Sequence, residues 1–141
     1  MKTVDELSSA AAVPAAAGPL VLVVDDETAV RRFAARVLER EGYVVVEAKD
    51  GIEALELLTQ KDVSVDVVVS DIVMPRLNGV ELMQALVVSH PDLPVILMSG
   101  YATGALAELG IAAPCAILPK PFPSERLLEE VRRCIGQRNR G

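Results

Sequence analysis

The sequence is poor in aromatic side chains. Among its 141 residues there are two Tyr, two Phe and no Trp, 3% in all. Proteins that bind single-stranded nucleic acid stack the bases on aromatic rings, so this scarcity argues against that function. The formal net charge of −6 argues in the same direction, because nucleic-acid surfaces are basic. We therefore expect no nucleic-acid partner, and a core built from Val, Leu, Ile and Ala.

Cysteine and long apolar runs are scarce as well. Cys115 and Cys134 are too few for a disulfide framework, and we expect both to be reduced thiols in a cytoplasmic protein. The apolar runs fall far short of the about 20 residues that a membrane-spanning helix needs, so we expect no direct membrane contact. Asp5, Glu6 and Pro14 interrupt any secretory signal at the beginning of the chain.

The chain is long enough for one domain with a sizeable core, since 51% of its residues are hydrophobic. Residues 1–18 are rich in Ala and Pro and are expected to form a linker or tail. Residues 19–141 are expected to form the folded domain.

From Pro19 onward, short β-branched runs alternate with amphipathic segments, which predicts strands alternating with helices. The predicted strands are 19–24, 43–48, 65–70, 94–99 and 115–120, and the predicted helices are 27–42, 51–61, 78–90 and 123–136. Between the last two strands, Gly104, Gly110 and Pro114 leave room only for a short or irregular fourth helix. This alternation predicts a doubly wound α/β fold, a parallel sheet with helices on both faces.

Chemically active side chains stand where the predicted strands end. Asp25 and Asp26 follow the first strand, Asp71 the third, Ser99 ends the fourth and Lys120 the fifth. The carboxyl ends of parallel strands meet at one edge, where such sheets bind ligands. Three carboxylates gathered there repel one another unless a cation joins them, and Mg²⁺ prefers oxygen ligands of this kind. The lysine and the hydroxyl would then address an anion, for which a phosphoryl group is the best candidate.

Four segments at these strand ends carry a family resemblance. "LVLVVDDE", "VVVSDIVMPRLNG", "PVILMSGYA" and "ILPKPF" resemble the signatures of the receiver domain of two-component response regulators, over roughly residues 20–136. The phrases "LMSGYA" and "ILPKPF" are similar to those of receiver domains fused to hybrid sensor histidine kinases. The resemblance implies a flavodoxin-like (βα)5 fold with a five-stranded sheet in the order 2-1-3-4-5.

The resemblance also implies a role for each residue of the metal site. Asp71 resembles the aspartate that accepts the phosphoryl group. Asp26 resembles the direct Mg²⁺ ligand, Asp25 the carboxylate that holds the ion through water, and the backbone carbonyl of Val73 the third protein ligand. The implied cofactor is Mg²⁺, and Asp71 would itself contribute to the metal site.

Two further positions match the family, and one departs from it. Ser99 resembles the switch hydroxyl, and Lys120 the lysine that contacts the phosphate. Ile117 stands where the family usually has a Tyr or Phe whose ring moves with the switch, which puts the standard output mechanism in doubt. The resemblance implies that the positions two beyond Asp71 and two beyond Ser99 control the access of water. Val73 and Tyr101 occupy them, and neither is an acid or amide that orients a water, so we expect slow self-dephosphorylation.

The expected function is a signalling switch, relay or phosphate store that is phosphorylated on Asp71 by a histidine kinase or a histidine phosphotransfer domain. Such a domain catalyses only its own phosphorylation and slow dephosphorylation, so it is not a conventional enzyme. The receiver of a hybrid sensor kinase and a stand-alone regulator both remain open, as does a weak homodimer. A haloacid-dehalogenase-type phosphatase is the rival from another class, but it needs a second Asp where Val73 stands.

Overall fold

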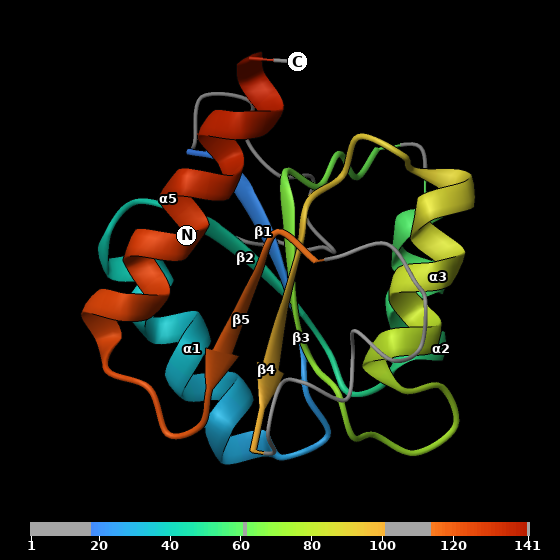
Figure 1. Cartoon of the computed structure of the whole chain (residues 1–141), viewed down its shortest axis with the longest axis horizontal. Helices are drawn as coiled ribbons and strands as arrows, with labels where there is room; N and C mark the ends of the chain where they lie inside the picture. The colour runs from blue at the N-terminus through green and yellow to red at the C-terminus, as the bar shows by residue number, and fades with distance from the viewer. Residues whose placement is uncertain (1–17, 61, 101–113, 141) are drawn as a thin grey trace, which may run out of the picture.

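Five parallel strands form one sheet in the computed structural model, which describes residues 18–60, 62–100 and 114–140 (Figure 1). The strands are β1 (Leu20–Val24), β2 (Val44–Ala48), β3 (Val67–Asp71), β4 (Val95–Ser99) and β5 (Ala116–Pro119). Their order is β2-β1-β3-β4-β5, and every neighbouring pair is parallel. The expected flavodoxin-like sheet order is confirmed.

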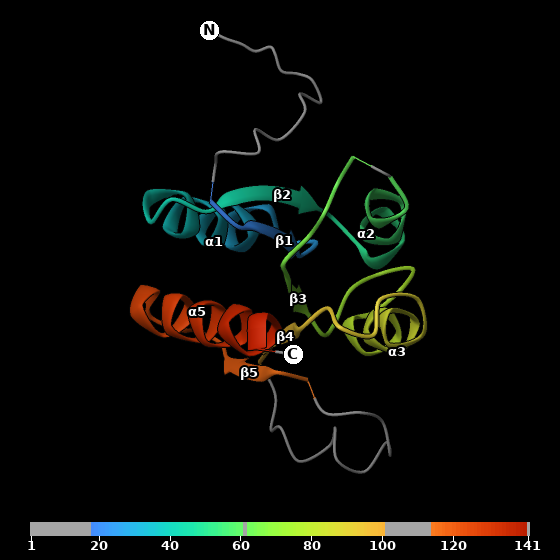
Figure 2. The ribbon, with the colours of Figure 1, turned by 90° about the horizontal axis from the view of Figure 1, so that it is seen from above.

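Helices cover both faces of this sheet. They are α1 (Thr28–Arg40), α2 (Gly51–Leu58), α3 (Gly79–Ser89) and α5 (Ser124–Arg140). Seen from above, α1 and α5 lie side by side on one face, and α2 and α3 on the other (Figure 2). The doubly wound α/β fold is therefore confirmed, whereas the expected short fourth helix falls on residues 101–113, outside the described residues. No helix among the described residues is long and apolar enough to span a membrane.

Each face of the sheet has its own hydrophobic core. Leu20, Leu22 and Val24 of β1 pack in the core beneath α2 and α3, whereas Val21 and Val23 pack in the core beneath α1 and α5. All five residues of β1 are buried, because successive side chains of a strand point to opposite faces and both faces are covered. The rigid sheet therefore presents its strand ends at fixed positions.

One local expectation about the helices is wrong. Helix α5 continues through Gly136 to Arg140 instead of ending at residue 136. A glycine ends a helix when it takes the left-handed conformation after it, and inside a helix it only lowers stability, by about 1 kcal/mol.

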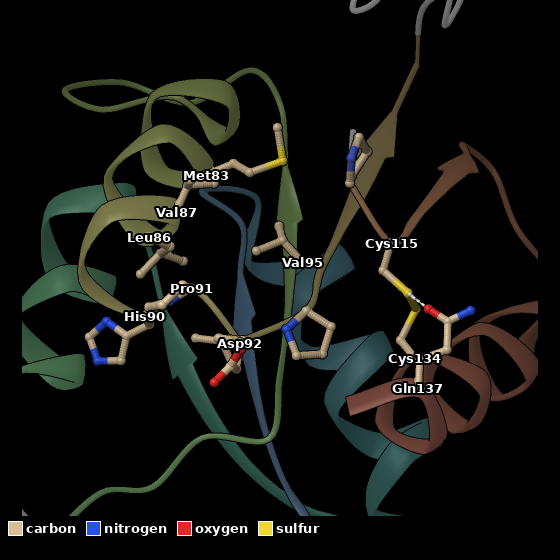
Figure 3. A pocket seen from close by; sticks show the side chains of 13 residues that line it. Met83, Leu86, Val87, His90, Pro91, Asp92, Val95, Cys115, Cys134 and Gln137 are labelled. Carbon is tan, nitrogen blue, oxygen red and sulfur yellow. Dashed lines mark hydrogen bonds between the residues drawn. A yellow bond between two sulfur atoms is a disulfide. The ribbon is translucent and has the colours of Figure 1, made fainter. Parts of the chain in front are cut away.

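The expectation of two reduced thiols is also wrong, because Cys115 and Cys134 form a disulfide bond (Figure 3). Cys115 directly precedes β5, and Cys134 lies on the buried side of α5, which packs back across the sheet. Their Cα atoms are 6.1 Å apart, within the usual range for a disulfide. The two residues are separated by 19 positions in sequence, so only the packing of α5 against β5 brings them together.

Candidate functional site

The carboxyl ends of four strands bring the predicted site residues together. Asp25 follows β1, Asp71 and Ser99 end β3 and β4, and Lys120 follows β5. The backbone N–H of Lys120 donates to the carbonyl of Ser99 over 2.8 Å, which joins the last two strand ends. Asp25, Asp71 and Ser99 are all buried, at 0%, 7% and 3% exposure. Polar side chains at this depth have to be satisfied by partners, so the site is built by the fold rather than added to its surface.

Three carboxylates form the acidic part of the site. Asp25, Asp26 and Asp71 each offer a carboxylate oxygen within 4.8 Å of the others, and Asp26 is the exposed member. Oxygen-only donors with one side open to solvent suit a hard divalent cation that retains several water molecules, as Mg²⁺ does. The residues present therefore fit the expected metal.

Lys120 provides the positive charge of the site. Its Nζ lies 3.2 Å from Oδ2 of Asp25 and 3.2 Å from Oδ1 of Asp71, and 3.9 Å from the Glu27 carboxylate. The ammonium group therefore bridges the two buried aspartates. A buried carboxylate without a partner would be costly, so this contact is also part of what lets the site fold without a metal.

The pKa values of the central pair follow from this arrangement. Burial, and next the neighbouring charge of Asp25, raise the pKa of Asp71 above its ordinary value of 3.8, although Lys120 opposes them. Burial alone would lower the pKa of Lys120, but the carboxylates of Asp25 and Asp71 outweigh it, and the pKa is raised. Both shifts are consistent because one ammonium is shared between two like charges. The site therefore lacks positive charge, which a cation would supply.

The loop after Asp71 has a close return that only glycine permits. Gly79 donates its N–H to the carbonyl of Ile72 over 2.9 Å, and a Cβ at Gly79 would overlap the carbonyl of Asp71. Ile72 in turn donates to Met98 of β4 over 3.1 Å. Both ends of the loop are thus fixed to the sheet, while Val73, the expected carbonyl ligand, lies inside it with a side chain that is 57% exposed.

Two site residues were not foreseen from the sequence. The carboxylate of Glu27 forms an ion pair with Lys120, and the backbone N–H of Glu27 donates to the Asp25 carboxylate over 2.8 Å. Arg31, one turn into α1, donates to the Asp25 carbonyl over 2.8 Å and to Glu47 over 2.9 Å. The adjacency of Glu27 to the two aspartates was a visible signal, whereas the role of Arg31 depends on how α1 packs against β2. Ile117, the departure from the family, lies partly buried in β5, and Tyr101 is outside the described residues.

Residues 21–132 match the family described as the response regulator receiver domain. The chain belongs to this family. Receiver domains are signalling domains of two-component systems, which agrees with the expected class of function.

The receiver domain is similar to parts of longer proteins. It is 44% identical over 116 residues to the sensor kinase CckA of Brucella abortus (strain 2308), covering 82% of this chain and 12% of that protein. It is 40% identical over 113 residues to the response regulator MprA of Mycobacterium sp. (strain KMS), covering 79% of this chain and 48% of that protein. The chain thus spans less than half the length of either relative.

A solved receiver structure shares the fold. The response regulator TrrA of Thermotoga maritima, determined in complex with Mg(2+)-BeF, is 30% identical and superposes with a TM-score of 0.74, covering 83% of this chain and 99% of that one. The resemblance to receiver domains proposed from four short segments is therefore confirmed over most of the chain.

Proposed function

We propose that this receiver domain accepts a phosphoryl group onto Asp71 from the phosphohistidine of a histidine kinase or a histidine phosphotransfer domain, in a reaction that requires Mg²⁺. The observation that carries the proposal is the buried Asp71 carboxylate, which lies 3.2 Å from Lys120 and beside two further carboxylates. That cluster has no evident structural purpose, since like charges at this depth destabilise a fold.

In the proposed reaction a carboxylate oxygen of Asp71 bonds to phosphorus as the phosphorus–nitrogen bond of the donor breaks, which gives a mixed anhydride. The positive charge of Lys120 favours the ionised form of Asp71, which burial disfavours. After transfer, the ammonium group can contact the negatively charged oxygens of the phosphoryl group. Asp25, Asp26, Asp71 and the carbonyl of Val73 would hold Mg²⁺. When bound, Mg²⁺ supplies the charge compensation that phosphoryl transfer requires.

The relatives support this proposal through what they are. CckA is a sensor kinase and MprA a response regulator, so matching domains occur both within a sensor kinase and within a response regulator. TrrA was solved with Mg(2+)-BeF, which supports Mg²⁺ as the metal of the family. The higher identity to CckA favours the receiver of a hybrid sensor kinase, with a stand-alone regulator as the alternative. A weak homodimer and no contact with nucleic acid or membrane belong to the same proposal. A cytoplasmic location belongs to it as well, but it rests on the family alone, because the two cysteines form a disulfide bond.

Incubation of the purified chain with a small-molecule phosphodonor, followed by intact-mass measurement, tests the proposal. We expect one added phosphoryl group in the presence of Mg²⁺, none after chelation, and none in Asp71→Asn. Labelling of Asp71→Asn at the wild-type rate would contradict the assignment of the acceptor. Repeated release of free phosphate from a phosphomonoester, without a persistent phosphoprotein, would favour the phosphatase class instead.

A further inference from the structure

An ion pair outside the acidic site ties the loop after Asp71 to the neighbouring helix. The Nε of Arg76 lies 3.0 Å from Oδ2 of Asp50, and its terminal Nη2 donates to Oδ1 of the same carboxylate over 3.1 Å. The guanidinium therefore contacts both carboxylate oxygens. This bidentate geometry makes arginine–carboxylate pairs strong and directional. Arg76 is five residues beyond Asp71, whereas Asp50 belongs to the segment between β2 and α2.

Asp50 is a fixed point rather than a mobile surface group. Its side chain is only 6% exposed, and its Oδ1 caps α2 by accepting the N–H of Glu53 over 2.9 Å. That hydrogen bond, with Arg76 adding to it, holds the pKa of Asp50 below its ordinary value, so the carboxylate is ionised at neutral pH. Exposed ion pairs are usually weak, but this one has a buried, preorganised partner.

The backbone at Arg76 adopts a conformation that needs such support. Its φ is +67°, in the left-handed region, and among the described residues it is the one non-glycine with positive φ. Side chains with a Cβ enter this region at a cost in free energy, and they remain there when surrounding contacts over-determine the backbone. The ion pair between Arg76 and Asp50 is one such contact.

A close backbone approach reinforces the pair. The N–H of Gly51 donates to the carbonyl of Leu77 over 3.3 Å. A Cβ at Gly51 would lie 2.6 Å from that carbonyl oxygen and 2.9 Å from Cδ2 of Leu77, so glycine is required for the two segments to meet. Residues 76 and 77 are thus held by α2, while the ends of the loop are held by β4 and α3.

We propose that Arg76 is a positioning residue for the metal: by gripping Asp50 it fixes the loop conformation from which the carbonyl of Val73 serves as a ligand. The inference rests on the proposed Mg²⁺ site. Without the pair, residues 73–77 would sample other conformations, and binding would have to select the competent one. The effect falls on metal affinity and not on the chemistry of Asp71.

Calorimetric titration of the metal-free protein with Mg²⁺ tests this inference. Arg76→Ala should raise the Kd for Mg²⁺ about tenfold, the lower end of the range for residues that hold a metal ligand in place. At saturating Mg²⁺ the rate of labelling by a phosphodonor should return to near the wild-type rate. Arg126→Ala is the matched control, because Arg126 pairs with Glu130 over 3.2 Å at similar exposure but lies on α5.

Further variants separate the ion pair from the backbone and from the fold. Arg76→Gly relieves the left-handed strain but removes the guanidinium, so it should also bind Mg²⁺ weakly. Asp50→Asn can still cap α2. Combined with Arg76→Ala, it should raise the Kd for Mg²⁺ little further, because the two changes break the same contact. Equal Mg²⁺ affinity in wild type and Arg76→Ala, or wild-type affinity in Arg76→Gly, would overturn the inference alone. A wild-type protein that binds no Mg²⁺ would overturn it together with the proposed function.

Discussion

The carboxyl edge of the sheet carries buried charge, whereas the amino ends of β4 and β5 border a pocket of mixed polar and apolar lining and a disulfide bond (Figure 3). At the first edge, Lys120 bridges two buried aspartates. At the second, a pocket of about 570 Å³ is lined in part by Met83, Leu86 and Val95, next to Cys115 and Cys134. Both regions include the ends of β4 and β5, but the cluster of buried carboxylates lies at the carboxyl edge.

The pocket therefore lies at the opposite edge from the proposed phosphoryl site. Apolar pockets are the usual expectation for small organic ligands, but a phosphoryl group and a divalent cation need converging charge instead. We therefore expect changes at the carboxyl edge to alter phosphoryl chemistry, and changes at the amino edge to alter stability.

Replacement of Lys120 should give the largest effect on chemistry. We expect Lys120→Ala to slow labelling by a phosphodonor about 100-fold or more at saturating Mg²⁺, because charge on the transferring group loses its partner. Mg²⁺ binding should be retained or tightened, since a neighbouring cation is gone. The labelling rate and a Mg²⁺ titration measure the two effects separately. Loss of Mg²⁺ binding in this variant would show that the lysine organises the acidic cluster instead of acting on the phosphoryl group.

Removal of the disulfide should affect stability and leave the chemistry unchanged. The Cys115–Cys134 bond closes a loop of 19 residues, so Cys115→Ser should lower the free energy of unfolding by about 3 kcal/mol in the chain-entropy account. Denaturant unfolding with and without a reductant measures this, because reduction of the wild type should reproduce the variant. Labelling of folded Cys115→Ser should proceed at the wild-type rate. A lower labelling rate in the variant or in the reduced protein would show that the amino edge also affects phosphoryl chemistry.

Sequence and structure agree best where the pattern is set by repeated local rules. Strand alternation and the strand-end residues Asp25, Asp71 and Lys120 were predictable, because a parallel sheet gathers its carboxyl ends regardless of detail. The disulfide was not, since it depends on where α5 crosses β5. The Asp50–Arg76 pair was equally hidden, because it joins two loops through a backbone conformation that arginine seldom adopts.

Asp71 should contribute to function at the expense of stability, whereas the disulfide at the amino edge should contribute to stability alone. Its raised pKa means that the folded state binds a proton more tightly than the unfolded state. The ionised carboxylate therefore destabilises the metal-free fold at neutral pH, and this penalty disappears as the pH falls through the raised pKa toward 3.8. Asp71→Asn should be more stable than wild type by about 1 kcal/mol at pH 7 without Mg²⁺.

Denaturant unfolding of both proteins between pH 7 and pH 4 measures this difference. The advantage of Asp71→Asn should shrink steadily as the pH is lowered. A variant that is less stable than wild type at pH 7 would mean that the contact with Lys120 outweighs the burial and the repulsion from Asp25. Val69 lies two residues before Asp71 in β3 and is fully buried. Val69→Ala should instead be less stable than wild type at every pH.

The smallest expected effect concerns the lifetime of the phosphorylated state. Hydrolysis needs a water aligned behind phosphorus. Val73, two residues beyond Asp71, is apolar and 57% exposed, and the family resemblance implies that this position flanks the approach of the water. We therefore expect phosphorylated wild type to persist for minutes or longer, a barrier on the order of 20 kcal/mol. Val73→Asn supplies an amide that can orient a water, and it should speed the loss of phosphate several-fold, about 1 kcal/mol of barrier. Val73→Ile is the matched control, since it keeps an apolar side chain and the backbone carbonyl. Loss of phosphate can be followed by intact mass after the donor is removed, and equal decay in all three proteins would show that this side chain does not control access of water.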